Sequence, residues 1–303
     1  MSNRTINELA RAQILALTRD ALNRSGALGT LPTPLDEVAR VAGICQMIDI
    51  SELPVELRRH KPWVLRRILG AIFFKERTVF IDRSQPEPRV RFTKAHEAGH
   101  GIIPWHAASY HLDDESRLSP DTREQLEVEA NLAAAHLLFQ GPNFHRRALD
   151  YQVSIAAPLA LADDHGASAH AAIRYYVEHH PDAVALLMLG RYVYADGTYP
   201  LWGSVESPSF LQRFGHLVDR FPERRVDYRD GDGRPFGDIL KASRIDTTPS
   251  KRLDVVDLRG DRKPFVAEAF FNGWTSMIML SEPSTRRFGR RLGVYPEPLA
   301  ATG

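Results

Sequence analysis

One short segment of this 303-residue chain combines residue types that can hold a metal ion and carry out acid–base chemistry. The run His96-Glu97-Ala98-Gly99-His100 has the spacing HExxH. On a helix, His96 and His100 lie one turn apart on one face, so both imidazoles can bind one metal ion at ~2.0–2.1 Å, a distance typical of zinc. Glu97 lies beside them and can act as a general base on water that the metal activates. The pattern predicts a metal-dependent hydrolase, the alternative being a chance pair of histidines.

A zinc site of this kind needs a third protein ligand, and the sequence offers three candidates. Glu127 lies on the next predicted helix, with Asn131 four residues later on the same face, where an amide can orient a ligating histidine. Glu129 lies in the same segment but points about 200° away from Glu127 around the helix. His106 has the spacing of the last histidine in HExxHxxGxxH, but Ile103 stands where that motif has glycine. Glu127 is therefore the favoured ligand, with His106 and Glu129 as alternatives.

Strands before the motif and helices around it are the elements that must position these residues. The predicted order is strands at 44–48, 68–74 and 78–81, a helix at 92–103, a loop at 107–119 and a helix from 119 to 139. The last helix has clear limits, because Ser119 is a good N-cap, Pro120 suits the first helical position, and Gly141 follows the end. Cys45 is expected to be a small buried residue of the first strand.

The strand just before the motif helix is a candidate for binding the substrate. In this strand, Val79 and Ile81 alternate with Thr78 and Phe80. We predict that these four residues form the edge strand above the metal and that they receive the substrate backbone by strand addition.

The bulk composition narrows the classes of function. Hydrophobic residues make up 43% of the chain and charged residues 25%, as in an ordinary globular protein. The net charge is only +1, so we expect no general nucleic-acid binding, and DNA contact is disfavoured. Because Cys45 is the single cysteine, no intrachain disulfide can form. The sequence shows neither a secretion signal nor a membrane-spanning apolar run, and we expect a cytoplasmic protein without membrane contact.

The second half of the chain has a different pattern. Residues 156–164 and 168–178 predict two short helices around Gly166, at spacings seen in helix-turn-helix units. Asp163 and Asp164 would repel phosphate, which favours a structural or protein-docking role over sequence-specific DNA binding. From about residue 181 the pattern changes to strands, with hairpin signals at Asp196-Gly197 and Asn272-Gly273.

The N-terminal part of the chain resembles the ImmA/IrrE family of bacterial metallopeptidases. The pieces that carry the resemblance, in order, are Leu35–Ala39, Val79–Asp82, Arg91–His100 and Glu127–Asn131. The resemblance covers about residues 5–145 and implies a gluzincin-like fold. It also implies His96, His100 and Glu127 as ligands of one Zn²⁺ ion, or of another divalent ion such as Mn²⁺, and Glu97 as the catalytic acid/base. Two segments depart from the family pattern, at residues 104–106 and 139–142.

The resemblance further implies a substrate class and a domain order. Several members of the family cleave a partner repressor with a helix-turn-helix of the XRE type, which releases genes for radiation or DNA-damage stress responses or for mobile-element transfer. We therefore expect an α+β protein with a zincin-like metallopeptidase domain at 1–145, a helix-turn-helix-like connector at 146–180, and a β-rich, GAF-like domain at 181–303. The last domain would dock partners or sense a small-molecule or other signal ligand.

Two other functions are compatible with the same residues. A non-proteolytic transcription regulator could bind DNA or protein and keep a structural zinc ion, although such a site has no use for the general base Glu97. A zinc-dependent hydrolase of a non-peptide substrate is the third reading.

Overall fold

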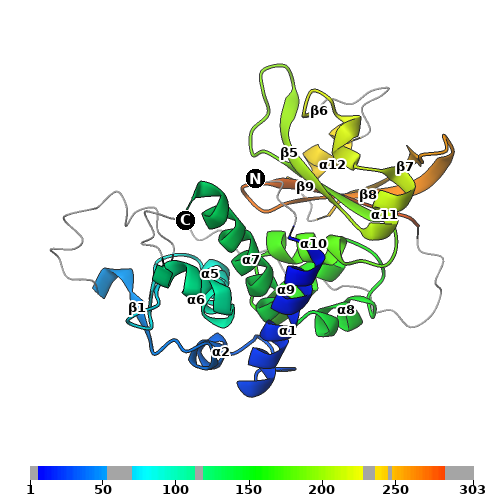
Figure 1. Ribbon diagram of the computed structural model, residues 1–303. Coiled ribbons are helices and arrows are strands. Elements are labelled where there is room, and N and C mark those ends of the chain that lie inside the picture. The colour runs from blue at the N-terminus through cyan, green and yellow to red at the C-terminus, as the bar shows by residue number, and fades with distance from the viewer. Residues whose placement is uncertain (1–5, 53–69, 113–118, 228–235, 245–247, 284–303) are drawn as a thin grey trace. The chain divides into compact units, whose positions relative to one another are not determined.

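The computed structural model describes residues 6–52, 70–112, 119–227, 236–244 and 248–283 (Figure 1). The chain divides into two compact units. Unit 1 comprises residues 1–144 and 164–168, and unit 2 comprises residues 145–163 and 169–303. Both helices and strands occur in each unit, so the predicted α+β class is confirmed at that level. The assignment of separate roles to residues 1–145, 146–180 and 181–303 stays a prediction.

Unit 1 contains a three-stranded sheet in which β3 is the central strand. The strands are β1 (Gln46–Asp49), β2 (Gly70–Phe73) and β3 (Thr78–Ile81), in the order β1-β3-β2. β3 pairs in parallel with β1 and antiparallel with β2. Val79 and Ile81 are fully buried, as a central strand requires.

The prediction that Thr78, Val79, Phe80 and Ile81 form an edge strand is therefore wrong. Both sides of β3 are already paired, so no backbone ladder is left for a substrate to join. The reason is a pairing between strands far apart in sequence, which alternation within one strand cannot reveal. Among the described strands of this sheet, β1 and β2 are the edges.

The helices described in unit 1 pack around one of them, the helix that contacts β2 and β3. They are α1 (Glu8–Arg24), α2 (Leu35–Val41), α5 (Glu87–Ile102), α6 (Pro104–Leu112) and α7 (Pro120–Phe139). α5 begins before the predicted residue 92, because Pro86 and Pro88 are tolerated at a helix start. α6 occupies much of the expected loop at 107–119, and it begins with a proline for the same reason.

α7 has the limits that its sequence predicted. The Ser119 side chain accepts a hydrogen bond from the Thr122 backbone N–H at 3.1 Å, and Pro120 occupies the first turn. At the other end, Gln140 adopts a left-handed conformation with φ 52°, and its amide bonds to the backbone of Gly29 and Thr30. The unusual segment at 139–142 thus anchors the loop that follows α1.

Unit 2 is built on a six-stranded antiparallel sheet in the order β6-β5-β4-β9-β8-β7. The strands are β4 (Val184–Leu189), β5 (Thr198–Glu206), β6 (Arg225–Asp227), β7 (Ser250–Val256), β8 (Arg262–Phe271) and β9 (Ser276–Ser281). The predicted hairpins are confirmed, since Gly197 and Gly273 take the positive φ values of 80° and 89° in the β4–β5 and β8–β9 turns. The β-rich character of this half is confirmed, and its GAF-like identity stays a prediction.

Helices accompany the sheet of unit 2. They are α8 (Pro142–Ala148), α9 (Ala156–His165), α10 (Ala169–Glu178), α11 (Pro208–Phe214) and α12 (Gly237–Ala242), with α8 and α9 crossing the boundary between the units. α10 packs on β4 and β5, and His170 on this helix lies 3.4 Å from the Met188 sulfur. α11 packs on β4 and buries Phe210 and Phe214 in the core of this unit. One face of α10, the second helix of the helix-turn-helix-like segment, is therefore occupied by its packing on the sheet.

A search for membrane spans over the described residues finds no helix with both the length and the apolar character that crossing a bilayer requires.

The central position of β3 generates a stability prediction. Val79→Ala should lower the free energy of unfolding by about 2 kcal/mol, because it truncates a fully buried side chain. Val79→Pro should cost more, because it also removes a backbone N–H and disturbs pairing within the sheet. Thermal unfolding of the two variants measures the difference, and equal midpoints would argue against β3 as a doubly paired strand.

A buried carboxyl in unit 2 generates a pH prediction. Glu268 on β8 is 8% exposed, and burial raises its pKa to about 7, while a hydrogen bond from the Ile155 N–H opposes the rise. A carboxyl with a raised folded pKa stabilises the fold below its unfolded pKa, and this contribution is lost as pH rises from 4.5 through about 7. Glu268→Gln should remove roughly 3 kcal/mol of this pH dependence. Unfolding at pH 5 and pH 8, with the exposed Glu223→Gln as control, tests it; identical pH profiles for all three proteins would contradict it.

Candidate metal centre

His96, His100 and Glu127 meet at one point of unit 1, as the sequence predicted. The two histidines lie one turn apart on α5, and their Nε2 atoms are 3.2 Å apart. Glu127 on α7 places Oε2 3.2 Å from His96 Nε2 and Oε1 3.6 Å from His100 Nε2. Within the described ranges, this is the one group of three such side chains whose ligand atoms lie close enough to share a metal ion. Two imidazole nitrogens and a carboxylate oxygen form a donor set that suits zinc.

The group is buried at His100 and open to solvent at Glu127. His100 is 3% exposed, whereas the Glu127 side chain is 47% exposed. Burial lowers the pKa of His96, but the hydrogen bond to Glu127 and nearby carboxylates outweigh it, so the pKa is raised. The close contacts with His100 and His96 hold the pKa of Glu127 well below its usual range, so this carboxylate stays anionic. An anionic side chain open to solvent gives a cation a route to the histidines.

Glu97 is a buried carboxyl beside this group. It is 5% exposed, and burial raises its pKa to about 7, which the positive field of His96 opposes and Glu127 reinforces. A pKa near 7 is what a general base needs at neutral pH. The geometry therefore brings together the four residues that HExxH and Glu127 predicted.

Gly70 at the start of β2 lies against the Glu97 carboxyl, which the sequence analysis missed. A Cβ added at residue 70 would lie 2.7 Å from Glu97 Oε1 and 2.3 Å from Thr93 Cγ2. A glycine inside a predicted strand often marks such a close approach of backbone, and this signal was available in the sequence. β2, an edge strand, thus runs beside the general base, where the sequence analysis had placed β3.

Asn131 lies one turn after Glu127 and contacts the other ring nitrogen of His96. Its Oδ1 is 3.1 Å from His96 Nδ1. With Nε2 facing the metal position, Nδ1 carries the proton and donates it to this amide oxygen. The position fits the predicted role of orienting His96.

The two alternative ligands, His106 and Glu129, lie behind His100. His106 Nδ1 is 2.9 Å from His100 Nδ1, the nitrogen that points away from Glu127, and His106 is fully buried. Glu129 Oε2 is 3.1 Å from His106 Nε2. Burial lowers the pKa of His106 to about 4, and the neighbouring His100 adds to the effect. Neither residue reaches the point where His96, His100 and Glu127 meet, so Glu127 remains the favoured candidate for the third ligand.

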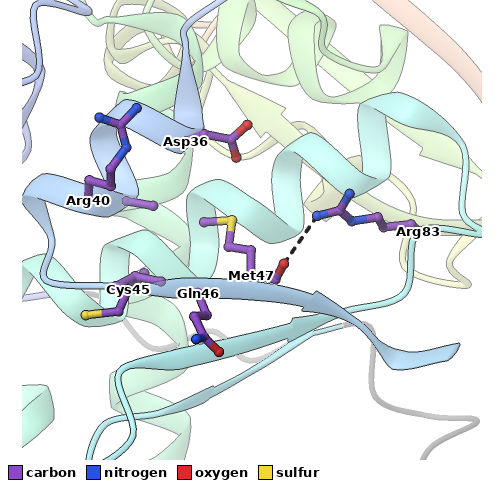
Figure 2. A pocket seen from close by; sticks show the side chains of 8 residues that line it. Asp36, Arg40, Cys45, Gln46, Met47 and Arg83 are labelled. Atoms are coloured by element: carbon purple, nitrogen blue, oxygen red, sulfur yellow. Dashed lines mark hydrogen bonds between the residues drawn. The ribbon is translucent and has the colours of Figure 1, made fainter. Parts of the chain in front are cut away.

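A separate hollow lies between α2 and β1 (Figure 2). Its volume is about 280 Å³, and its walls include Asp36, Arg40, Cys45 and Arg83, the last of which donates to the Met47 carbonyl at 3.4 Å. None of the four residues of the metal group lines it. Cys45 is exposed here, so the expectation that it is buried is wrong, because it precedes an edge strand.

Metal binding by this group is directly testable. The purified protein should bind about one zinc ion per chain, and His96→Ala should lose most of that affinity, because one of three ligands is removed. Metal analysis and chelator competition measure both quantities. The exposed Asp20→Asn on α1 is the control, and unchanged affinity in His96→Ala would contradict the assignment.

Comparisons with known proteins find a family and a solved structure to which this chain is similar. Residues 54–174 match the peptidase M78 family, described as the IrrE N-terminal-like domain, and this segment contains His96, Glu97, His100 and Glu127. The chain is also similar to a solved structure of a Mycobacterium tuberculosis transcriptional regulator, with a TM-score of 0.54 and 12% sequence identity over 89% of this chain and 76% of that chain. At that identity the likeness shows the fold alone. A comparison with curated proteins finds no match.

The family match extends past residue 145 into α10, and it begins after residues 35–39, so its limits differ from those of the predicted resemblance. It includes every residue of the metal group and the strands on either side of the turn at 74–77. Residues 54–174 are thus similar to the IrrE N-terminal-like domain, which is consistent with the resemblance of this part of the chain to the ImmA/IrrE family.

Proposed function

We propose that this protein is a zinc-dependent endopeptidase that cleaves a partner transcriptional repressor carrying an XRE-type helix-turn-helix. The observation that carries the proposal is the buried carboxyl of Glu97 beside the group of His96, His100 and Glu127. A structural zinc site is closed by four ligands and needs no base, whereas this group offers three ligands and an adjacent carboxyl. The family match supports peptide hydrolysis over other hydrolytic reactions.

Each residue of the site has a separate role in the proposed hydrolysis. When bound, a zinc ion supplies Lewis acidity, which polarises a peptide carbonyl and lowers the pKa of water to about 7. Glu97 takes the proton of the attacking water and passes it to the leaving amine. His96 and His100 hold their Nε2 atoms toward the metal position, and Asn131 keeps His96 in the required tautomer. Burial of Glu97 keeps its pKa near 7, so it can both accept and return a proton.

The substrate strand that fits this arrangement pairs with β2 (Gly70–Phe73). In the described part of the sheet, β2 has β3 on one side only, and Gly70 lies against Glu97. A peptide added antiparallel or parallel to β2 would have its backbone fixed by main-chain hydrogen bonds close to the base. The absence of a side chain at Gly70 keeps the carboxyl in place.

The proposal extends to the repressor and to the signal that regulates its cleavage. Cleavage of a repressor would release stress genes, such as those of DNA-damage or radiation responses, or genes for transfer of a mobile element. We assign selection of the partner, or sensing of a small-molecule signal, to residues 181–303, because their described part contains no further metal group. The proposal places the protein in the cytoplasm, where a repressor would meet it.

A second candidate is a transcription regulator that acts without proteolysis. The likeness in fold to a protein named as a transcriptional regulator favours it. This regulator would bind DNA or a partner protein and keep zinc for stability. The two candidates differ in whether Glu97 is needed.

The variant Glu97→Gln distinguishes the endopeptidase from the non-proteolytic regulator. The change keeps the size of the side chain but removes the base, and loss of a general base lowers a rate by about 10²–10⁴-fold. Cleavage should become hard to detect, while zinc content stays near one per chain, because Glu97 is not a ligand. Profiling of new protein N-termini in cells that express wild type or Glu97→Gln measures cleavage and identifies the repressor.

The matched control is Glu87→Gln, an exposed charge removal in the first turn of the same helix. It should cleave like wild type. If Glu97→Gln derepresses the target genes as well as wild type does, proteolysis is not the mechanism and the second candidate stands.

A further inference from the structure

A buried chain of hydrogen-bonding side chains leads from the metal group to an interior carboxylate. His100 Nδ1 lies 2.9 Å from His106 Nδ1, and His106 Nε2 lies 3.1 Å from Glu129 Oε2. His100, His106 and Glu129 are 3%, 0% and 5% exposed, so water does not compete for these contacts. This series of three side chains, which we call the relay, runs from α5 through α6 to α7. It ends on the Glu129 carboxylate, which the proposed catalytic steps do not use.

The direction of the hydrogen bonds follows from the donors that surround Glu129. Glu129 accepts from Trp105 Nε1 at 2.7 Å and from Gln125 Nε2 at 2.9 Å, which are obligate donors, so its carboxylate is stabilised as an anion and can accept a third bond. His106 must then carry its proton on Nε2 and donate it to Glu129, which leaves Nδ1 as an acceptor. His100 consequently carries its proton on Nδ1, and its Nε2 lone pair points to the side where His96 and Glu127 meet.

We propose that His106 and Glu129 are positioning residues that fix the ring orientation and tautomer of the metal ligand His100 and raise its donor strength. This role rests on the metal site of the proposed function. Metal-ligating histidines commonly donate their second N–H to a group that fixes them, and such partners tune metal affinity. Here the partner is an imidazole backed by a carboxylate, whereas the partner of His96 is the neutral amide of Asn131.

The cost of the arrangement argues for a role beyond packing. A buried carboxylate loses hydration, and apolar side chains of similar volume often give equal or greater stability. The Glu129 carboxylate has three hydrogen-bonding neighbours, and two of them, Trp105 and His106, lie on α6. The one direction that the relay permits delivers an unprotonated Nε2 to the metal position.

Zinc affinity of the full-length chain is the first test, measured by competition with a chromophoric chelator. His106→Leu removes both ring nitrogens and should weaken zinc binding about 10–100-fold. His106→Asn places an amide oxygen near the position of Nδ1, so it should recover part of that loss. Glu129→Gln keeps the shape of the side chain, removes its charge and should also weaken binding. Glu87→Gln, the exposed charge removal on α5, should bind like wild type.

The tautomer of His106 is the second test, and it needs no metal. Long-range ¹H–¹⁵N spectra of histidine-labelled, metal-free wild type should show His106 as the neutral Nε2–H form. An Nδ1–H form would overturn the relay, because two N–H groups would then face each other. This measurement remains decisive even if His106→Leu fails to fold.

The outcomes separate the relay from the proposed function. If wild type binds no zinc, the proposed function fails, and the His106 tautomer still decides the relay. If wild type binds zinc and folded His106→Leu binds it equally well, the relay is overturned while the metal site stands. Equal affinities of His106→Asn and His106→Leu would also overturn it, since an acceptor for His100 would then have no effect.

Discussion

The close approach of α5 and α7 at Gly99 is the constraint on which the metal group depends. A Cβ at residue 99 would lie 2.9 Å from Ala133 Cβ and 3.2 Å from the Ala130 carbonyl oxygen, so only glycine allows this helix spacing. The two histidines are fixed on α5, and Glu127 is fixed on α7, so their meeting is a property of the helix crossing. A bulkier residue at 99 would move the carboxylate away from both imidazoles together.

The same helix is held on its other sides by further contacts of small residues. Gly101 approaches the Ala42 carbonyl at the end of α2, and Gly70 approaches Glu97 from β2. Lys94 adds an ion pair with Asp36 of α2 at 2.8 Å. α5 therefore packs against α7, α2 and the sheet. Rigid elements on all sides suit a site in which three ligand atoms must stay within a few ångströms of one another.

Local sequence signals predicted the parts of this site that lie within one element. HExxH fixes the relation of His96, Glu97 and His100 through helical geometry alone, and Ser119 and Gly141 mark the limits of α7 through capping. What failed depended on pairing between distant segments. β3 is central because β1, which precedes residues 53–69 in the sequence, pairs with it on the side opposite β2. No feature of Thr78–Ile81 itself encodes that neighbour.

His106 and Glu129 show why residue types alone could not settle the third ligand. Both are chemically able to bind zinc, and the sequence analysis kept both as alternatives to Glu127. The turn into α6 at Pro104 directs His106 to Nδ1 of His100 instead of Nε2, and the 200° separation of Glu129 from Glu127 around the helix carries Glu129 to the same far side. Residues that cannot reach the metal from that side can still act on it through the ring between them. His106 and Glu129 thus lie on the Nδ1 side of the His100 ring, and Glu127 lies on its Nε2 side. A proton held on Nδ1 leaves Nε2 able to bind a metal ion.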